Sequence, residues 1–263
     1  MTRDADSYLA ADFPDVLRKI RERTPARILA GRAGAAYRTS TQLELREAHA
    51  AARDAVCAEL DLESALGAAF IKQWNLFEVR TQAHSKAEYL LQPDLGRRLG
   101  EASRRELTNR CSRETDIQIT IGDGLSVTAV AAQVPSLLPL LDAGARARGW
   151  TVGNPFVIRY CRVGVLNEIG ELLAPKVSIL LIGERPGLAT AESLSAYMAY
   201  RPATLHTDAD RNLISNIHSR GLRPQGAADR ILNLAAQMIT LRLSGFSIRE
   251  QMPPAPGDLA IPE

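Results

Sequence analysis

The apolar run at residues 177–182 constrains the fold of this chain more than any other feature. Its length suits one β-strand, and a continuous apolar run is typical of a strand buried on both faces, as in a parallel sheet. A polar turn with the sequence Gly-Glu-Arg-Pro-Gly follows at once, at residues 183–187. Because α/β proteins bind ligands beyond the carboxyl ends of such strands, this turn is a candidate ligand-binding loop.

Two interpretations of the turn stay open on its residues alone. Either it contacts a ligand, or Gly183 and Gly187 serve turn geometry while Glu184 and Arg185 form a solvated ion pair. A Gly-x-x-x-Gly turn is by itself a weak signal. The chain has no Gly-x-Gly-x-x-Gly motif, which leaves little support for a dinucleotide site of the usual kind.

Strand and helix patterns alternate around this run. Residues 116–121 and 156–160 read as strands, and the extended pattern continues through residues 163–166. The helical patterns between the strands cover residues 127–130, 136–148, where Pro139 could interrupt the helix, and 169–173. We therefore predict an α/β fold, with a Rossmann-like domain and a largely parallel sheet over residues 111–250.

The end of this domain carries weaker patterns. They predict a turn or short helix near residues 193–200 followed by an edge strand, a helix start at residues 208–211, and a last helix over residues 225–243 that ends at Gly245. The Pro-rich tail at residues 251–263 is predicted to be disordered.

Residues 1–110 are predicted to form a mostly helical N-terminal region. An amphipathic helix starts near Asp12, and its apolar face either docks on the body, which we favour, or engages another protein. A strongly helical stretch follows at residues 42–60, and two further helices lie within residues 85–109. Residues 67–83 either pack in the core or cross to it as a strand.

Asp123 lies in the turn after the strand at residues 116–121. In that position it either contacts a ligand or caps the helix that follows, and we favour the cap because Asp is a preferred capping residue.

The composition excludes several classes of protein. Lys plus Arg total 32 against 30 for Asp plus Glu, a net charge of +2 that gives no signal for nucleic acid. The three cysteines are scattered without Cys-x-x-Cys spacing, and the four histidines form no metal-binding pair, so we expect neither a disulfide framework nor a protein-built metal site. No continuous apolar run of membrane-spanning length and no secretion signal occur, which favours the cytoplasm.

Several motifs, taken in order, resemble the small subunit of ethanolamine ammonia-lyase from about residue 14 to residue 245. They are Thr-Pro-Ala-Arg-Ile at residues 24–28 with Gly-Arg-Ala-Gly at 31–34, Tyr-Leu at 89–90 with Pro-Asp-Leu-Gly-Arg-Arg-Leu at 93–99, Ile-Gly-Asp-Gly-Leu-Ser at 121–126, Ile-Gly-Glu-Leu-Leu at 169–173, Leu-Ile-Gly-Glu-Arg-Pro-Gly-Leu at 181–188 and Ile-Ser-Asn-Ile-His at 214–218.

The resemblance implies an adenosylcobalamin-dependent enzyme that converts ethanolamine to acetaldehyde and ammonia by a radical mechanism. It places the family's cobalamin contacts at Val163, Glu184 and Leu213. The last position is often Cys in the family, so a contact there would use the backbone or the apolar surface of Leu213. No catalytic residue is implied on this subunit, because the cofactor supplies the reactivity and the protein supplies position and enclosure.

The resemblance also implies partners and a location. The large subunit of the family is a TIM barrel that binds ethanolamine, with cobalamin at the junction of the two subunits and several large-small pairs in a hetero-oligomer. The implied location is the cytoplasm, either free or within a bacterial microcompartment whose shell would be a further partner. The alternative is a non-catalytic α/β subunit that binds a nucleotide-like ligand or acts as a scaffold.

Overall fold

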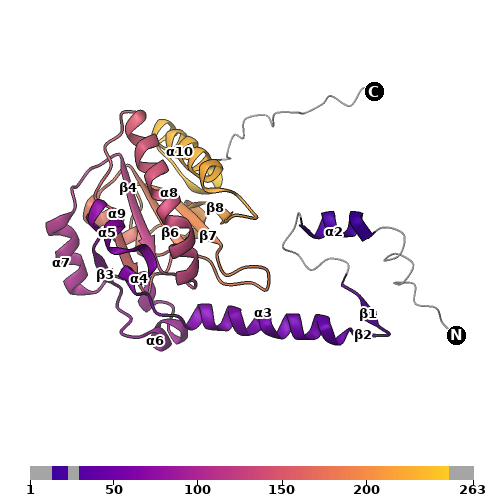
Figure 1. Ribbon diagram of the computed structural model, residues 1–263. Coiled ribbons are helices and arrows are strands. Elements are labelled where there is room, and N and C mark those ends of the chain that lie inside the picture. The colour runs from indigo at the N-terminus through magenta and orange to yellow at the C-terminus, as the bar shows by residue number, and fades with distance from the viewer. Residues whose placement is uncertain (1–13, 23–29, 249–263) are drawn as a thin grey trace, which may run out of the picture.

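A six-stranded sheet with the order β3-β5-β4-β6-β7-β8 forms the centre of the computed structural model, which describes residues 14–22 and 30–248 (Figure 1). Strands β3, β5, β4 and β6 are mutually parallel, and β7 runs antiparallel to β6 and β8. The predicted α/β class with a largely parallel sheet is therefore confirmed. The strands are β3 (Glu78–Arg80), β4 (Ile117–Gly122), β5 (Phe156–Arg159), β6 (Val177–Gly183), β7 (Leu194–Tyr200) and β8 (Asn212–Ile217).

Helices cover both faces of the sheet, which explains the apolar run of the sequence. All seven residues of β6 are buried. Ile179 and Leu181 pack on the face that carries α4 (Leu62–Leu66), α8 (Val127–Ala147) and α10 (Pro224–Leu241), whereas Leu180 and Ile182 pack on the face that carries α7 (Glu101–Arg110) and α9 (Val165–Leu173). A strand buried on both faces reads as continuous apolar sequence because successive side chains point to opposite faces.

Helix α8 is one continuous helix, so the prediction of two segments, with Pro139 as an interruption, was wrong. Pro135 and Pro139 lie inside it. The helix persists because its side chains at Val134, Leu137 and Leu138 are fully buried in the core, which offsets the lost backbone hydrogen bonds. Among the described residues, α8 is the one helix long and apolar enough to cross a membrane, and its packing against both the sheet and the neighbouring α10 explains that composition.

Four elements in the second half of the chain differ from the prediction. The extended pattern at residues 163–166 is a turn into α9, which begins at Val165. β7 is a full strand inside the sheet, and β8 is the edge strand instead. The predicted helix start at residues 208–211 is a single 3-10 turn, Asp208–Asp210, closed by a capping box between Thr207 and Asp210. Helix α10 ends at Leu241, with Arg242 left-handed, rather than at Gly245.

The region before β4 is mostly helical but also contributes to the sheet. The stretch at residues 67–83 becomes both a helix and the edge strand β3, which pairs with β5. The remaining elements are α2 (Pro14–Glu22), β1 (Arg32–Ala33), β2 (Ala36–Tyr37), α3 (Thr39–Cys57), α5 (Ala68–Gln73), α6 (Lys86–Leu91) and the 3-10 turns Leu95–Arg97 and Gly245–Ser247.

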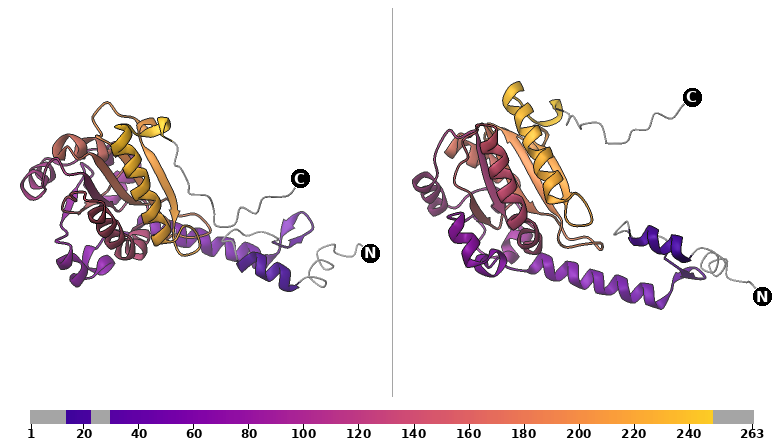
Figure 2. Two further views of the ribbon diagram at one scale, coloured as in Figure 1. Left: turned by 90° about the horizontal axis from the view of Figure 1, so that it is seen from above. Right: turned by 45° about the horizontal axis from the view of Figure 1, so that its top comes forward.

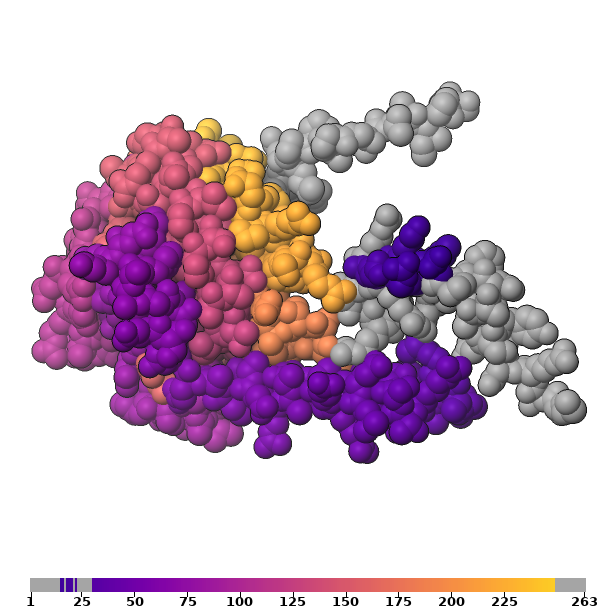
Figure 3. Space-filling model, viewed as in Figure 1, coloured from indigo at the N-terminus to yellow at the C-terminus, as the bar shows by residue number. Residues whose placement is uncertain are grey.

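Helix α3 extends away from the rest of the molecule. It has 19 residues, of which Ala55 alone is buried, and its first turns reach beyond the body in every view (Figures 1, 2 and 3). The predicted helix start at Asp12, the motif at residues 24–28 and the tail at residues 251–263 lie outside the described residues.

Candidate functional site

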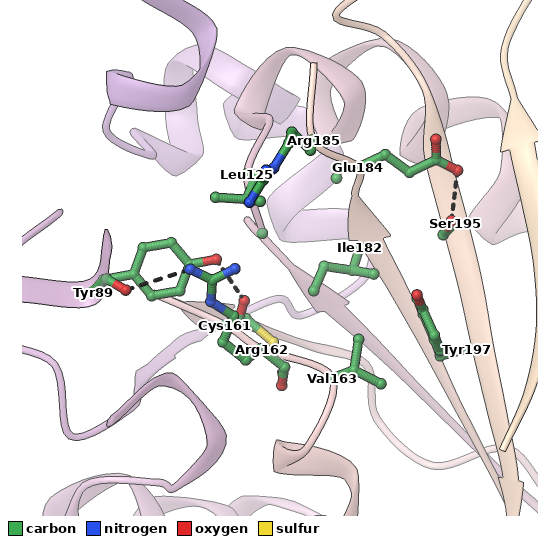
Figure 4. Close-up of a pocket in the computed structure, with 12 residues that line it drawn as sticks. Tyr89, Leu125, Cys161, Arg162, Val163, Ile182, Glu184, Arg185, Ser195 and Tyr197 are labelled. Carbon is green, nitrogen blue, oxygen red and sulfur yellow. Dashed lines mark hydrogen bonds between the residues drawn. The ribbon is translucent and has the colours of Figure 1, made fainter. Parts of the chain in front are cut away.

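Strand ends from the middle of the sheet meet around one open pocket. The carboxyl ends of β4, β5 and β6 share an edge because these strands are parallel, and β7 begins at this edge while β8 ends there. The pocket at this edge has a volume of about 210 Å³. Its walls are Tyr89, Gly124, Leu125, Cys161, Arg162, Val163, Ile182, Gly183, Glu184, Arg185, Ser195 and Tyr197 (Figure 4).

Glu184 holds the ends of three strands together. Its Oε1 accepts hydrogen bonds from Ser195 Oγ at 2.6 Å and from the Asn216 amide at 3.0 Å, and its Oε2 accepts one from Ser193 Oγ at 2.7 Å. The sequence left open a solvated ion pair between Glu184 and Arg185. That pair does not form, because the Glu184 carboxylate binds β7 and β8 instead.

These contacts leave one acceptor position of the Glu184 carboxylate unoccupied. A carboxylate offers about four lone-pair sites, two on each oxygen. Three of them are taken by the hydrogen bonds to Ser193, Ser195 and Asn216, so Oε2 keeps room for one further donor. Glu184 is only partly buried and lines the pocket, which leaves this position open to a ligand.

Val163 forms part of an apolar wall in the same pocket. It lies in the turn between β5 and α9, where its carbonyl accepts the Leu166 amide at 3.1 Å. The side chain packs partly buried against the cluster that contains Ile182, and the two side chains lie next to each other in Figure 4. The structure thus brings Val163 and Glu184, two of the three residues singled out by the sequence, to one pocket.

Leu213 lies beside this pocket rather than in its wall. It sits on β8 directly opposite Tyr197 of β7, and Tyr197 does line the pocket. Paired residues of antiparallel strands point to the same face, so the Leu213 side chain extends the pocket surface past Tyr197. With 47% of its surface exposed, Leu213 offers an apolar contact and no polar group.

Asp123 supports the opposite wall, and the prediction that it caps α8 was wrong. The cap is Ser126, whose hydroxyl accepts the Ala129 amide. The Asp123 carboxylate is 1% exposed and accepts the amides of Tyr160 at 2.9 Å and Cys161 at 2.8 Å. These two amides begin the turn that carries Val163, so Asp123 fixes the position of that turn.

A lysine lies buried near this carboxylate. Lys86, at the start of α6, is 6% exposed, and its Nζ donates to the Gly124 carbonyl at 3.3 Å. Burial raises the pKa of Asp123, and the Lys86 ammonium together with the amides of Cys161 and Tyr160 opposes that effect. Burial lowers the pKa of Lys86, and Asp123 opposes it in turn. The two groups are therefore stabilised by one another in their charged forms.

Tyr89 closes the same side of the pocket. Its hydroxyl donates to the Cys161 carbonyl at 3.0 Å, and the guanidinium of Arg162 lies 4.3 Å from its ring centroid. Desolvation by burial raises the pKa of Tyr89, so the phenol stays protonated. With Asp123 and Lys86, it links α6 to the turns after β4 and β5.

Sequence reasoning missed four of these residues: Lys86, Tyr89, Ser195 and Tyr197. The sequence contained one indication for Lys86. A lysine in the first turn of a helix is unfavourable next to the positive end of the helix dipole, which suggests that another contact stabilises it. The sequence contained a second indication for Ser195 and Tyr197, since residues two apart on a strand point to the same face. Tyr89 stood in one of the family motifs, but its place in the pocket depends on how α6 packs over the strand ends, which no local pattern shows.

The side chains of the pocket are suited to binding rather than to reaction. The Cys161 thiol is fully buried, and burial raises its pKa well above the usual range, which makes it unreactive. The hydroxyls of Ser193 and Ser195 are engaged by a carboxylate that is itself fixed. Within the described ranges, no group of three His, Cys, Asp or Glu side chains is placed to hold a metal ion.

Comparison with known proteins agrees with the motifs. The family model for the ethanolamine ammonia-lyase light chain (EutC) matches residues 14–249. The chain is 39% identical over 249 residues to an ethanolamine ammonia-lyase small subunit of Clostridium perfringens, covering 94% of this chain and 82% of that one. It is 40% identical over 233 residues to the small subunit of Clostridium acetobutylicum, covering 89% and 94%. The family predicted from the sequence is thus confirmed: the chain belongs to the ethanolamine ammonia-lyase light chains.

Proposed function

We propose that this chain is the small subunit of an adenosylcobalamin-dependent ethanolamine ammonia-lyase and covers one side of the corrin ring with the pocket at the sheet edge. Together with a large subunit it would convert ethanolamine to acetaldehyde and ammonia. The observation that carries the proposal is that Val163 and Glu184, which follow different strands, line one pocket in a chain of this family.

The chemical character of the pocket residues fits that of a corrin. The rim of a corrin is apolar between primary amide side chains, and the pocket pairs apolar walls at Val163, Ile182 and Leu125 with a free acceptor on Glu184. The volume of about 210 Å³ is below the ~300–1,000 Å³ of sites that enclose a small molecule. The pocket could therefore cover only part of a cobalamin, and a second protein surface would have to complete the site.

These residues suggest separate roles for the cofactor, this chain and the large subunit. Bound adenosylcobalamin would supply the radical chemistry, and this chain's residues would hold and enclose the corrin. Val163, Ile182 and Leu213 would exclude water from the corrin edge, and Glu184 would orient it. Substrate-binding groups would come from the large subunit, a TIM barrel, with several large-small pairs in one hetero-oligomer.

The decisive experiment is to purify the chain with its large subunit and to assay acetaldehyde release with and without adenosylcobalamin, recording the visible spectrum of the cofactor. We expect activity and a spectral change that both require the two subunits. A stable complex with neither activity nor spectral change would overturn the proposal and leave the alternative, a scaffold or a subunit for a nucleotide-like ligand.

Replacing Glu184 should weaken cobalamin binding without unfolding the protein. We expect Glu184→Ala to cost about 1–3 kcal/mol of binding free energy, because a polar group of the cofactor loses its partner. Glu184→Gln keeps the shape and one acceptor oxygen and should have the milder effect. A spectroscopic titration of the two-subunit complex measures both.

Ser193→Ala is the matched control for Glu184. It removes the partner of Oε2 and leaves the carboxylate in place, so cobalamin affinity should stay near that of the wild type. Unchanged affinity in Glu184→Ala would count against the contact.

The N-terminal segment would determine where in the cell the enzyme is located and would take no part in the reaction. In helix α2 the side chains of Val16 and Ile20 are exposed four residues apart, as on a face that could bind another protein. We expect deletion of residues 1–20 to leave activity unchanged and to abolish co-localisation with microcompartment shell proteins in cells that make them. Fluorescence microscopy of labelled wild type and deletion variant checks this, and unchanged co-localisation would assign targeting elsewhere.

A further inference from the structure

Tyr197 occupies the centre of the surface that the candidate contacts define. It lies opposite Leu213 in the register of β7 and β8, it packs in the same cluster as Val163, and it shares the pocket wall with Glu184. Ser195 and Tyr197 are two residues apart on one strand, so they point to the same face. In Figure 4 the Tyr197 hydroxyl is directed toward Ser195 and Glu184.

The hydroxyl of Tyr197 is a free donor. Within the described part of the chain it makes no hydrogen bond, whereas the hydroxyl of Tyr89 across the pocket is engaged by the Cys161 carbonyl. Burial raises the pKa of Tyr197, and the carboxyl groups of Glu184 and Asp208 raise it further against the opposing effect of Arg211. The phenol therefore stays protonated and can donate throughout the physiological range.

The pocket thus presents one free donor, the Tyr197 hydroxyl, and one free acceptor, on the Glu184 carboxylate, with Ser195 between the two (Figure 4). A primary carboxamide has the complementary pair, a carbonyl that accepts and an N–H that donates. A carboxylate ligand would be repelled by Glu184, and an alkyl group would leave both protein groups unpaired.

On the basis of the proposed function, we propose that Tyr197 and Glu184 together bind one primary carboxamide side chain of the corrin, with the Tyr197 hydroxyl donating to its carbonyl oxygen and Glu184 Oε2 accepting its N–H. Tyr197 is then a further binding residue for the amide carbonyl, and Glu184 selects the amide against the corresponding acid.

The test uses the complex of both subunits and titrates it with adenosylcobalamin. Tyr197→Phe removes only the hydroxyl and should lower affinity by about three- to tenfold. Tyr200→Phe is the matched control, since Tyr200 lies on the same strand but packs against the cluster on the opposite face and does not line the pocket. It should bind as the wild type does.

A second titration uses the six cobalamin monocarboxylic acids, each with one of the primary acetamide or propionamide side chains hydrolysed. We expect one of the six acids to bind the wild type at least about tenfold more weakly than the others, because its carboxylate faces Glu184, and Glu184→Gln to remove that difference. Equal affinity of Tyr197→Phe and wild type, or an equal loss for all six acids, overturns the inference. Failure of the wild-type complex to bind cobalamin at all would instead overturn the proposed function.

Discussion

Asp123→Ala should lower the free energy of unfolding by about 3–5 kcal/mol, the largest effect expected of a single substitution near the pocket. The change leaves the buried amides of Tyr160 and Cys161 without an acceptor, and it removes the carboxylate that most opposes the effect of burial on the pKa of Lys86. Urea denaturation of the purified chain, followed by circular dichroism, measures the loss.

Two further variants make this expectation specific. Asp123→Asn keeps the shape but offers one acceptor oxygen for two amides, so it should fall between Ala and wild type. Asp142→Ala is the control, since it removes a carboxylate that pairs with an exposed arginine, Arg146, and should cost less than about 1 kcal/mol. A loss at Asp123 no larger than at Asp142 would show that the buried pair contributes little.

Gly124→Ala should cost about 2–5 kcal/mol, the second large effect. Gly124 has a φ of +56°, where a side chain costs about 1–2 kcal/mol. An added Cβ would also lie 2.3 Å from the Gly183 carbonyl oxygen, a backbone atom held by the Leu125 amide, and such overpacking costs about 1–3 kcal/mol.

Gly187→Ala provides the comparison for Gly124→Ala. Its nearest neighbour beyond the adjacent residues is the Ala189 amide nitrogen at 4.0 Å, so the added methyl group makes only an ordinary van der Waals contact. Its unfolding midpoint in urea should stay within error of the wild type. Equal midpoints for the two variants would contradict a tight contact between the turns after β4 and β6.

The sequence was sufficient to predict the parts of the site that depend on local pattern. The apolar run at residues 177–182 indicated a strand buried on both faces, and the polar turn behind it was correctly placed at a sheet edge that forms a pocket. The family motifs then singled out Val163 and Glu184, which lie in that pocket. Each of these inferences rests on residues adjacent in the chain or on motifs of several residues.

What the sequence could not predict depends on contacts between distant segments. β7 contains Leu, Ala and Met, which are good helix formers, and only its pairing with β6 and β8 decides for a strand. Asp123 was predicted to be the helix cap because it is a preferred capping residue in the turn before α8, but the helix begins later and its cap is Ser126. The burial of Lys86 follows from the packing of α6 over the strand ends, for which no local pattern exists.

The extended helix α3 has a consequence for how this chain can be attached to other molecules. Nineteen residues of helix span about 28 Å, at about 1.5 Å per residue, and nearly all of them lie on the surface. Anything joined to its amino-terminal end is held at that distance from the body without displacing a core side chain. The position is therefore suitable for a fused fluorescent protein or an affinity handle, and the sequence ahead of it can change with the cellular setting while the pocket stays as it is.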